Sequence, residues 1–427
     1  MKTSLDDINI KNYPNLSQVF SQNQLVPLKA YSSGLFNKEK SEIEPELLSA
    51  FKKEWQASGW CSTDIIKASA QLQKNPVIQT SHHITPTNGP TFLTLDMICL
   101  CGLKPDLYYL VGANSGVAFS NSAWTGALSY KAVQLSQLLL EGSQAYHQAV
   151  KSNQERVLHG NIENRYSLIP ARQRDQLLYG VKITESIYKK YAQLNIELRD
   201  RLPKMEIGKR YDRWAVKSCE QIQKTILNQP NILYFNINQV ITNYLIAIIK
   251  KEEIQHPVFQ IFFGKKSKAF WTDFKEYPAF LGSYSGKKSH KVDQLTWGKE
   301  GLIGKKTIYP IAKPEDLLML LQQTKICPAV LITFLILKFI NRIRCLGSFN
   351  QIEYLENIRL KLFDFPPRWN LDLNQEADNM LTTGRIFKLG KPYWPLDLFL
   401  EKSSIDVQDF AEYPMIKFWQ PIINQLN

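Results

Sequence analysis

The sequence predicts an α/β protein with a mostly parallel sheet, and two observations carry that prediction. A short apolar segment, Val77 to Gln79, is followed by a polar Gly/Pro loop and then by a helical apolar pattern that starts at Phe92. A second apolar segment, Leu107 to Val111, is followed by a stretch rich in Gly, Ser and Asn. The order strand, polar loop, helix, strand is typical of a βαβ unit, whose two strands are parallel.

The same alternation continues along the chain. Leu233 to Phe235 and Val258 to Phe263 are strand candidates, and a helical pattern over Val240 to Glu253 separates them. Upstream, apolar residues recur at spacings of three and four between Glu46 and Gln73, with an interruption at Gly59, which predicts two short helices. These segments extend the α/β prediction to both halves of the chain.

Four segments organise the chain. Helical periodicity dominates residues 128–226 and predicts a large helical insertion. Residues 264–306 combine lysines with aromatic and glycine residues that suit antiparallel hairpins, which predicts a small β-rich basic region. The expected division is 1–127, the N-terminal part of the α/β core; 128–226, the helical insertion; 227–365, the C-terminal part of the core including the basic region 264–306; and 366–427, a C-terminal packing segment.

Composition bounds the class of protein. The 427 residues are 44% hydrophobic and 21% charged, which is typical of a globular chain and excludes a fibrous or disordered one. The six cysteines are scattered in apolar surroundings and no secretory leader is evident, so we expect reduced thiols in a cytoplasmic protein. The longest apolar run, Pro328 to Leu337, is shorter than the roughly 20 residues of a membrane-spanning helix. We expect a buried helix there and no membrane span.

The loop after the first strand is the leading candidate for a ligand site, because loops at the carboxyl edge of a parallel sheet bind ligands in open α/β folds. His82 and His83 are the candidate catalytic residues, since histidine titrates near neutral pH. One of them at most faces a ligand, because successive side chains of an extended loop point to opposite sides. Ser81, Asn88 and Gly89 are candidate substrate contacts. Histidines that only fix the loop by hydrogen bonds are the alternative interpretation.

Three other polar segments supply further candidate contacts: the stretch after the second strand, a proline-initiated segment of the insertion, and the turn after the buried helix. The arginines of the insertion could bind a carboxylate or phosphate, although a surface helix turn explains them equally well. The glycine of the last turn suits an ordinary hinge as well as a substrate site. The candidates are Asn114, Ser115, Asn121, Arg172, Arg174, Gly347, Asn350, Gln351, Glu353 and Tyr354.

Several familiar site types are missing from the sequence. Neither GxxxxGK[ST] nor GxGxxG occurs, which argues against a P-loop NTPase while leaving ATP open as a co-substrate. CxxC and HExxH are absent, so a metal would need distant partners for His82 or His83, and we expect no metal. No GxSxG nucleophile elbow occurs. Cys99 and Cys101 lie on the apolar helix, where packing is favoured over a thiolate role.

About half of the net charge of +13 lies in residues 264–306, where ten lysines face four acids. This region is a candidate surface for nucleic acid or anionic lipid, with Trp271, Tyr277, Tyr284 and Trp297 as residues that could stack on bases. Solvated lysine-rich hairpins with aromatic residues in their core are the simpler interpretation. Nucleic acid is therefore not the favoured partner.

Two segments resemble, in order, the enzymes that add cysteine in the last step of bacillithiol biosynthesis. Gln79 to Phe92 is similar to that family's Thr-Gly-Gln-Gln-type loop with its Gly-Pro turn and helix. Ile326 to Tyr354 is similar to its buried, proline-initiated helix and Gly-Gly-Pro-x-Glu-Ile-x-Tyr turn, and Phe365 to Arg368 to the Pro-Arg that follows. The family's acidic motif is replaced by Gly112 to Ser122, and too few residues follow for its long helical coiled coil. The resemblance implies a Rossmann-like core and small-molecule joining chemistry.

Together these observations predict a small-molecule biosynthetic enzyme, a ligase or transferase, that condenses an amino-acid-like nucleophile with a carboxylate- or phosphate-bearing partner. His82 or His83 would manage protons, and the polar turns would hold the small-molecule substrate. The alternative is a non-catalytic basic protein that binds nucleic acid or anionic surfaces through residues 264–306. Steep salt dependence of binding would favour the alternative.

Overall fold

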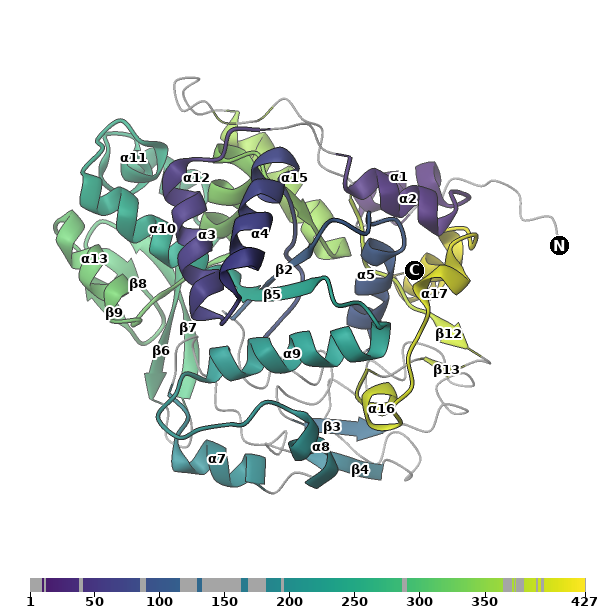
Figure 1. Cartoon of the computed structure of the whole chain (residues 1–427). Coiled ribbons are helices and arrows are strands. Elements are labelled where there is room, and N and C mark those ends of the chain that lie inside the picture. Colours follow the sequence, from purple (N-terminus) through teal and green to yellow (C-terminus); the bar gives the residue numbers. More distant parts are fainter. Residues whose placement is uncertain are drawn as a thin grey trace.

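The computed structural model describes residues 10, 13–37, 41–84, 90–115, 129–132, 163–167, 182–192, 196–285, 290–363, 371, 373, 380–388, 391–392 and 395–426. In this part of the chain, a four-stranded parallel sheet and a five-stranded antiparallel sheet are surrounded by helices (Figure 1). The protein is therefore mixed α/β, as the sequence predicts.

The strands of the parallel sheet come from distant parts of the chain. Their order across the sheet is β11-β1-β2-β5, so the direction in which strands are added reverses next to β1. Ligands of open α/β sheets bind at such a reversal, outside the carboxyl ends of the strands. The strands are β1 (Val77–Gln79), β2 (Tyr109–Ala113), β5 (Ile232–Asn236) and β11 (Arg344–Leu346).

Both faces of the parallel sheet are covered, and its side chains alternate between two hydrophobic clusters. Val77 and Val111 belong to the first cluster, whereas Ile78 and Leu110 belong to the second. Successive strand residues point to opposite faces, so this division places helices on both sides of the sheet. The result is a three-layer arrangement in which only the strand ends are free to carry polar groups.

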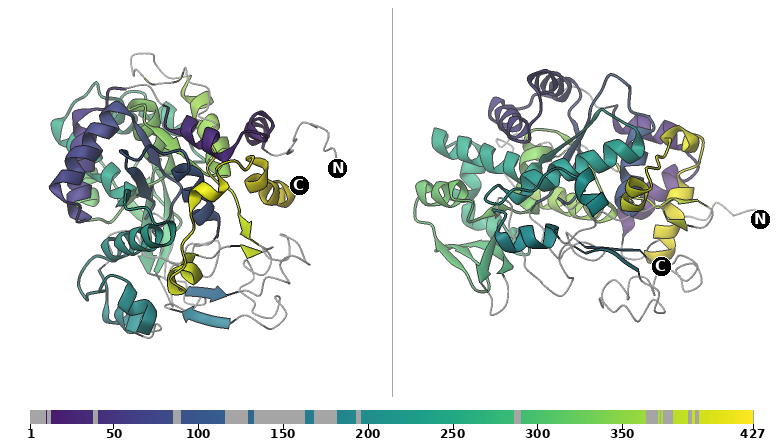
Figure 2. Two further views of the ribbon diagram at one scale, coloured as in Figure 1. Left: turned by 45° about the vertical axis from the view of Figure 1, so that its right-hand side comes forward. Right: turned by 60° about the horizontal axis from the view of Figure 1, so that its bottom comes forward.

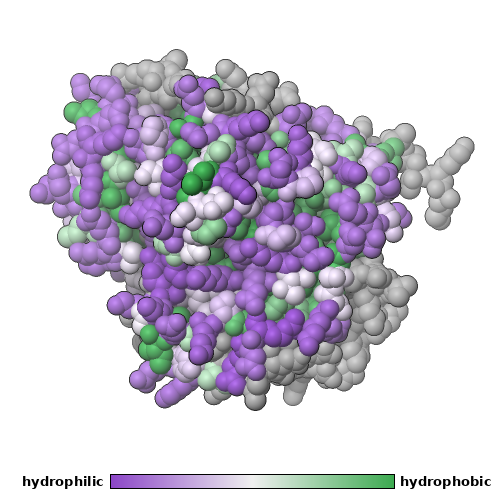
Figure 3. All heavy atoms as spheres, in the orientation of Figure 1, coloured by the Kyte–Doolittle hydropathy of each residue, from purple (hydrophilic) through white to green (hydrophobic). Residues whose placement is uncertain are grey.

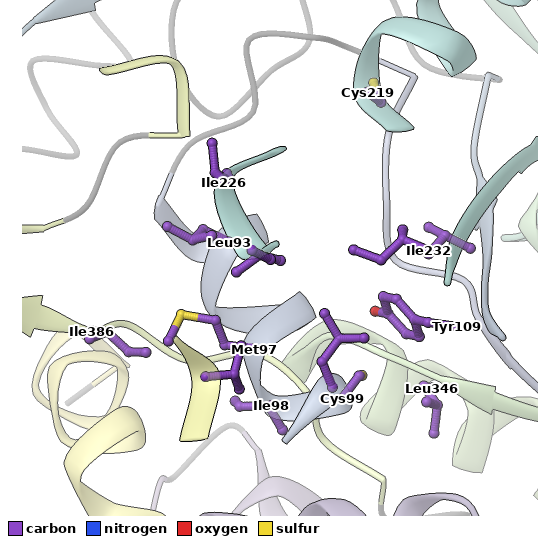
Figure 4. Packing of buried hydrophobic residues seen from close by; sticks show 14 of the residues in the cluster. Leu93, Met97, Ile98, Cys99, Tyr109, Cys219, Ile226, Ile232, Leu346 and Ile386 are labelled. Atoms are coloured by element: carbon purple, nitrogen blue, oxygen red, sulfur yellow. The ribbon is translucent and has the colours of Figure 1, made fainter. Parts of the chain in front are cut away.

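The first face is covered mainly by α5 and α9, and α5 is apolar nearly all round because it lies between the sheet and outer helices. Figure 4 shows Cys99 of α5 beside Tyr109 of β2, and Met97 on the other side of the helix beside Ile386. Burial of each large apolar side chain stabilises the fold by roughly 1.5–3 kcal/mol. The helices on this face are α1 (Pro14–Asn23), α2 (Leu28–Leu35), α5 (Pro90–Leu100), α9 (Tyr211–Leu227), α16 (Pro395–Leu400) and α17 (Ile416–Leu426).

The second face is covered by helices that include the two predicted between Glu46 and Gln73. The buried helix predicted over Pro328 to Leu337 is also confirmed, as an α-helix that continues into a π-helix after the short strand Cys327–Pro328. In Figure 1 the strands β2 and β5 lie between α9 and the pair α3 and α4. These helices are α3 (Pro45–Ala57), α4 (Ser62–Lys74), α10 (Ile237–Lys251), α14 (Val330–Phe334), η2 (Leu335–Ile340) and α15 (Phe349–Leu362).

The antiparallel sheet lies in the predicted β-rich basic region and extends beyond it. Its strand order is β10-β6-β7-β8-β9, and it shares the second hydrophobic cluster with the parallel sheet. Three helices pack around it. The elements are β6 (Phe280–Ser285), β7 (His290–Gly298), β8 (Gly301–Ile303), β9 (Ile308–Pro310), β10 (Cys327–Pro328), α11 (Pro257–Phe263), α12 (Ser267–Asp273) and α13 (Pro314–Gln322).

Two predictions about this region are wrong. Val258 to Phe263 forms helix α11 rather than a strand, because Pro257 occupies its first position and the His256 side chain accepts a hydrogen bond from Val258 N at 3.1 Å. Since every residue of the segment except Gln260 is apolar, its periodicity could not separate a buried strand from a buried helix. Likewise, the region expected to form hairpins begins with helix α12. The helix expected at Pro314 is confirmed as α13.

The range 128–226 contains strands as well as helices. β3 (Ser129–Ala132) and β4 (Glu163–Ser167) pair in an antiparallel arrangement, and α7 (Glu185–Ala192) and α8 (Ile196–Arg201) come later in the range. Helix α9, at the end of this range, packs against β5 and belongs to the layer that covers the parallel sheet. The predicted insertion is thus not purely helical.

The C-terminal segment completes the first face. It contains the hairpin β12 (Phe387–Lys388) and β13 (Lys391–Pro392) and the short helix η4 (Val407–Phe410). Helix α17 packs against α1, so that elements from both ends of the chain lie together, away from the antiparallel sheet (Figure 2). No helix in the described ranges is long and apolar enough to cross a membrane. On the face shown in Figure 3, hydrophobic residues form only small, separate patches.

Candidate functional site

The polar segments that follow the four parallel strands meet at one edge of the sheet, which we call the carboxyl edge. Thr80 to Ile84 follow β1, Asn114 and Ser115 follow β2, and Asn236 is the last residue of β5. Gly347 follows β11 directly. Because the strands are parallel, their carboxyl ends lie side by side. The edge therefore brings together the predicted candidates Ser81, His82, His83, Asn114, Ser115, Gly347 and Gln351.

The two histidines are positioned by their main chain. Asn114 N donates to His82 O at 2.6 Å, and Ile84 N donates to Asn114 O at 3.0 Å, so His83 and Asn114 form one more parallel bridge beyond the strands. This extension keeps the loop in a strand-like conformation. One histidine is therefore buried under the loop while the other is partly exposed.

His82 is the buried histidine, and its ring is fully occupied by partners. Its Nε2 lies 2.8 Å from Asp96 Oδ1, and its Nδ1 lies 3.3 Å from the Tyr234 hydroxyl. Asp96 also accepts a hydrogen bond from the Tyr109 hydroxyl at 2.9 Å. All four side chains are 0% exposed. We call them the His82–Asp96 cluster.

The two tyrosines of the His82–Asp96 cluster act as hydrogen-bond donors. Burial, followed by the charge of Asp96, raises the pKa of both phenols well above its ordinary value. Both hydroxyls therefore stay protonated at neutral pH. A closed, mutually hydrogen-bonded cluster of this kind joins α5 to the sheet and leaves His82 no free nitrogen for a ligand.

His83 has the opposite environment. Its side chain is partly exposed, its ring lies 5.6 Å from that of Phe92, and its Nδ1 has no hydrogen-bond partner among the described residues. Desolvation, followed by the neighbouring His82, lowers the pKa of His83 to about 4. At neutral pH the His83 imidazole is uncharged and can accept a proton or a hydrogen bond.

A hydrogen-bonded network closes the gap between β1 and β11, where the strand order reverses. The Thr80 hydroxyl donates to Leu346 O at 3.0 Å and lies 3.1 Å from Gln351 Oε1, while the Ser81 hydroxyl lies 3.4 Å from the same oxygen. Gln351 Nε2 in turn donates to Cys345 O at 2.9 Å. Gln351 thus fastens the loop after β1 to the strand β11.

Gly347 allows Gln351 to reach that position. A Cβ at residue 347 would lie 2.2 Å from Cδ of Gln351, which no real contact tolerates. Gln351 is buried, with 2% of its surface exposed. The glycine predicted as a turn or hinge is therefore required here by a close side-chain approach.

The ends of β2 and β5 form a second polar network. The Ser115 hydroxyl donates to Asn236 Oδ1 at 2.9 Å, and Ser115 N donates to Asn238 Oδ1 at 2.8 Å. Asn236 Nδ2 donates to Asp212 Oδ2 at 2.8 Å. Asn236 and Asp212 are both almost fully buried. Ser115 is therefore held by the network at the carboxyl edge.

Asp212 supplies the charge of this network, and Arg210 balances it. Arg210 donates to both oxygens of Asp212, at 3.0 and 2.7 Å, and also to Gln239 at 2.9 Å. Burial raises the pKa of Asp212, but the hydrogen bonds and charge of Arg210 outweigh burial, so the pKa lies below its ordinary value. Arg210 is still 30% exposed and is the cation of this network.

Some of the predicted site residues make contacts elsewhere in the fold or are exposed to solvent. Glu353 accepts hydrogen bonds from Leu16 N at 2.9 Å and from Asn15 Nδ2 at 2.8 Å, so it holds the start of α1. Tyr354 packs 5.5 Å from Phe334 on the second face, and Asn350 is exposed on the first turn of α15. The remaining candidates lie outside the described residues; they are Asn88, Gly89, Asn121, Arg172 and Arg174.

Several residues of the His82–Asp96 cluster and of the two networks were missed from the sequence, among them Asp96, Asp212, Asn236 and Asn238. The two asparagines carry a readable signal, because they follow the apolar strand Ile232 to Phe235 directly, as the histidines follow β1. Asp96 is an acid within an apolar helix, which is also a signal. Asp212 lies in the first turn of an ordinary amphipathic helix, and nothing in the sequence distinguishes it.

The thiols near the edge are packing residues. Burial raises the pKa of Cys99 to about 12 and that of Cys101 to about 11, so both stay protonated at neutral pH. Within the described ranges, no three His, Cys, Asp or Glu side chains gather so as to hold a metal ion. The chemistry of the edge thus rests on a neutral imidazole, hydroxyls and amides.

No protein-family model matches the chain, and neither a curated protein nor a solved structure is significantly similar to it. The function of the carboxyl edge is therefore argued from its own residues.

Proposed function

We propose that the chain is a small-molecule biosynthetic enzyme that condenses an amino-acid-like nucleophile with a carboxylate- or phosphate-bearing partner at the carboxyl edge. The observation that carries the proposal is His83, whose side chain is partly exposed while its buried Nδ1 has no hydrogen-bond partner, beside the point where the strand order reverses. Most other polar groups described at this edge bond to one another. His83 differs from them because one of its ring nitrogens has no hydrogen-bond partner.

His83 would take the proton that the nucleophile loses. With a pKa of about 4 the imidazole is neutral at physiological pH, but it is a weak base. An anionic partner bound beside it would favour the imidazolium and raise this pKa toward neutrality. The His83 imidazole would then become a stronger base only when the carboxylate or phosphate is bound. Proton transfer would therefore require both substrates.

Neutral and cationic groups would hold the partner. Ser81 and Asn114 flank His83 and are partly exposed. Arg210 belongs to the neighbouring network and keeps 30% of its side chain exposed. Because this guanidinium already donates to both oxygens of Asp212 and to Gln239, it would act on a carboxylate or phosphate through its positive charge.

Two further features support this proposal. The strand order β5-β2-β1-β11, in chain order third, second, first, fourth, is the order expected for a Rossmann-like core, which the resemblance to the bacillithiol enzymes also implies. All six cysteines are unpaired, which suits the reducing cytoplasm. ATP stays open as a co-substrate of the condensation.

The test is a product screen. Purified protein is incubated with pools of amino acids and of small carboxylates or phosphates, with and without ATP, and mass spectrometry identifies condensed products. We expect His83→Ala to abolish product formation while its thermal unfolding stays cooperative. Asp106→Ala, an exposed substitution before β2, is the matched control. Undiminished turnover in His83→Ala would contradict the proposed role.

A further inference from the structure

A groove lies on the antiparallel sheet, between α11, α12, β7 and the start of α13. We call it the Trp271–Trp297 groove. Its volume is about 940 Å³, at the upper end of the roughly 300–1,000 Å³ typical of ligand pockets. Its floor is aromatic and its rim is basic. The aromatic residues are Phe259, Phe262, Phe263, Trp271 and Trp297, and the basic residues are Lys265, Lys268, Lys299 and Lys313.

The aromatic floor is rigid. Trp271 is buried, and its indole N–H donates to Ile261 O at 2.8 Å. Trp297 lies nearly parallel to it, with centroids 6.2 Å apart and planes at 28°, and packs 4.9 Å from Phe262. Trp297 and Phe263 are both partly exposed. Two aromatic side chains are therefore held in place and still accessible to a ligand.

The positive charge of the rim is not neutralised. All four rim lysines are exposed and none forms an ion pair with another described residue. Two of the four acids between residues 264 and 306 are used internally. The Asp293 carboxylate accepts main-chain hydrogen bonds from Lys305 at 2.9 Å and Lys306 at 3.0 Å, and Glu276 pairs with Lys361 of α15. The other two acids, Asp273 and Glu300, are exposed, and the exposed lysines of residues 264–306 outnumber them.

We propose that the Trp271–Trp297 groove binds single-stranded nucleic acid, with bases stacked on Trp297 and Phe263 and phosphates beside the rim lysines. Aromatic faces next to lysines are the combination that single strands require, because unpaired bases offer faces for stacking and each nucleotide carries a negative charge. A groove of this size holds more than one nucleotide.

The observations favour a single strand over an acidic peptide or a duplex. An acidic peptide would use the lysines but would leave the aromatic faces without a planar partner. A duplex hides its base faces in the stack, so it would gain nothing from Trp297 or Phe263. Lys266, between the groove residues Lys265 and Ser267, is a further exposed cation, and exposed lysines at positions 275, 305 and 306 add to the positive charge of this region, which suits a polyanion better than a free nucleotide.

Fluorescence anisotropy with a labelled single strand of about twelve nucleotides tests the proposal on the full chain. The expected result is binding at about 50 mM salt, with a slope of log K against log salt near −3 if four phosphates are neutralised. The fourfold variant Lys265→Gln, Lys268→Gln, Lys299→Gln, Lys313→Gln should lose most of the affinity and most of the slope. Trp297→Leu should weaken binding about tenfold or more at each salt concentration while keeping the slope. Phe263→Ala provides a second test of stacking if Trp297→Leu fails to fold.

A matched control removes the same charge elsewhere. Lys52, Lys53, Lys67 and Lys104 are exposed on α3, α4 and the loop before β2, and their fourfold change to glutamine should lower the affinity far less. Absence of binding at low salt would overturn the proposal. Equal loss in the control variant would do the same, since it would show attraction by net charge alone. Polyglutamate or duplex that binds as tightly as the single strand, with no effect of Trp297→Leu, would assign the groove to acidic protein or to nonspecific polyanions instead.

Discussion

The polar groups of the carboxyl edge and those of the Trp271–Trp297 groove differ in burial and in hydrogen bonding. At the edge, Asp96, Gln351 and Asn236 are buried and hydrogen-bonded to neighbouring side chains or main chain, and His83 keeps an unpartnered nitrogen. At the groove, the lysines are exposed and have no ion-pair partner among the described residues. Substitutions at the edge should therefore cost stability first, whereas substitutions in the groove rim should leave stability nearly unchanged.

The largest effect is expected in the His82–Asp96 cluster. Asp96→Ala should lower the free energy of unfolding by about 3–5 kcal/mol, because it leaves His82 and Tyr109 without their buried partner and opens a cavity. Urea unfolding at neutral pH measures the loss. Asp106→Ala, exposed on the loop before β2, should change stability by less than about 0.5 kcal/mol. A loss of under about 1 kcal/mol for Asp96→Ala would show that the cluster is not a structural unit.

The second effect is a pH dependence that His83 imposes on stability. The pKa of His83 is about 4 in the folded chain, below its ordinary value of 6.5, so between these values the unfolded chain binds a proton that the folded chain does not. Stability from His83 is therefore full above about pH 6.5 and falls as the pH drops toward 4, by at most about 3 kcal/mol. His83→Gln should abolish this component. The measurement is the difference in unfolding free energy between wild type and His83→Gln at neutral pH and at about pH 4.5. A difference that does not change with pH would contradict the neutral state of the His83 imidazole in the folded chain.

A third substitution tests the close approach of Gln351 to Gly347. Gly347→Ala should cost about 1–3 kcal/mol, because the new Cβ would displace the Gln351 amide from Cys345 O and from the Thr80 hydroxyl. In the double variant with Gln351→Ala, the added methyl has room. The two losses should then be less than additive by about 1 kcal/mol in a double-mutant cycle. Additive losses would mean that the glycine is needed for its backbone rather than for Gln351.

The sequence predicts the location of the carboxyl edge better than it predicts which residues there could contact a ligand. The segments after β1 and β2 could be placed at one edge because each follows an apolar strand, whereas the strand β11 before Gly347 was not predicted. Alternation also predicts that only one of His82 and His83 faces outward. Which one depends on Asp96 and Tyr234, which reach His82 from another helix and strand. That choice is made by tertiary packing, which local spacing does not encode.

Less of the Trp271–Trp297 groove than of the carboxyl edge could be predicted from the sequence. Its basic, aromatic composition is visible in residues 264–306, and hairpins are correctly expected over much of that range. However, every residue of Val258 to Phe263 except Gln260 is apolar, so no helical period was visible and the helix α11 that forms one wall was predicted as a strand. Lys313 completes the rim from a helix start distant in the chain. The composition thus indicated a basic region rich in aromatic residues, but it did not predict the groove that these residues form.

The smallest effect on stability is expected for substitution of the rim lysines of the groove, and it distinguishes the groove from the carboxyl edge most clearly. The fourfold lysine-to-glutamine variant at positions 265, 268, 299 and 313 should change the free energy of unfolding by less than about 0.5 kcal/mol, because no ion pair is lost and repulsion among the lysines is relieved. Urea unfolding of this variant beside wild type and Asp96→Ala makes the measurement. If the rim variant lost as much as Asp96→Ala, the lysines would have structural partners, and the groove would resemble the carboxyl edge. If it kept its stability and lost single-strand binding, its charge would be held for a ligand rather than for the fold.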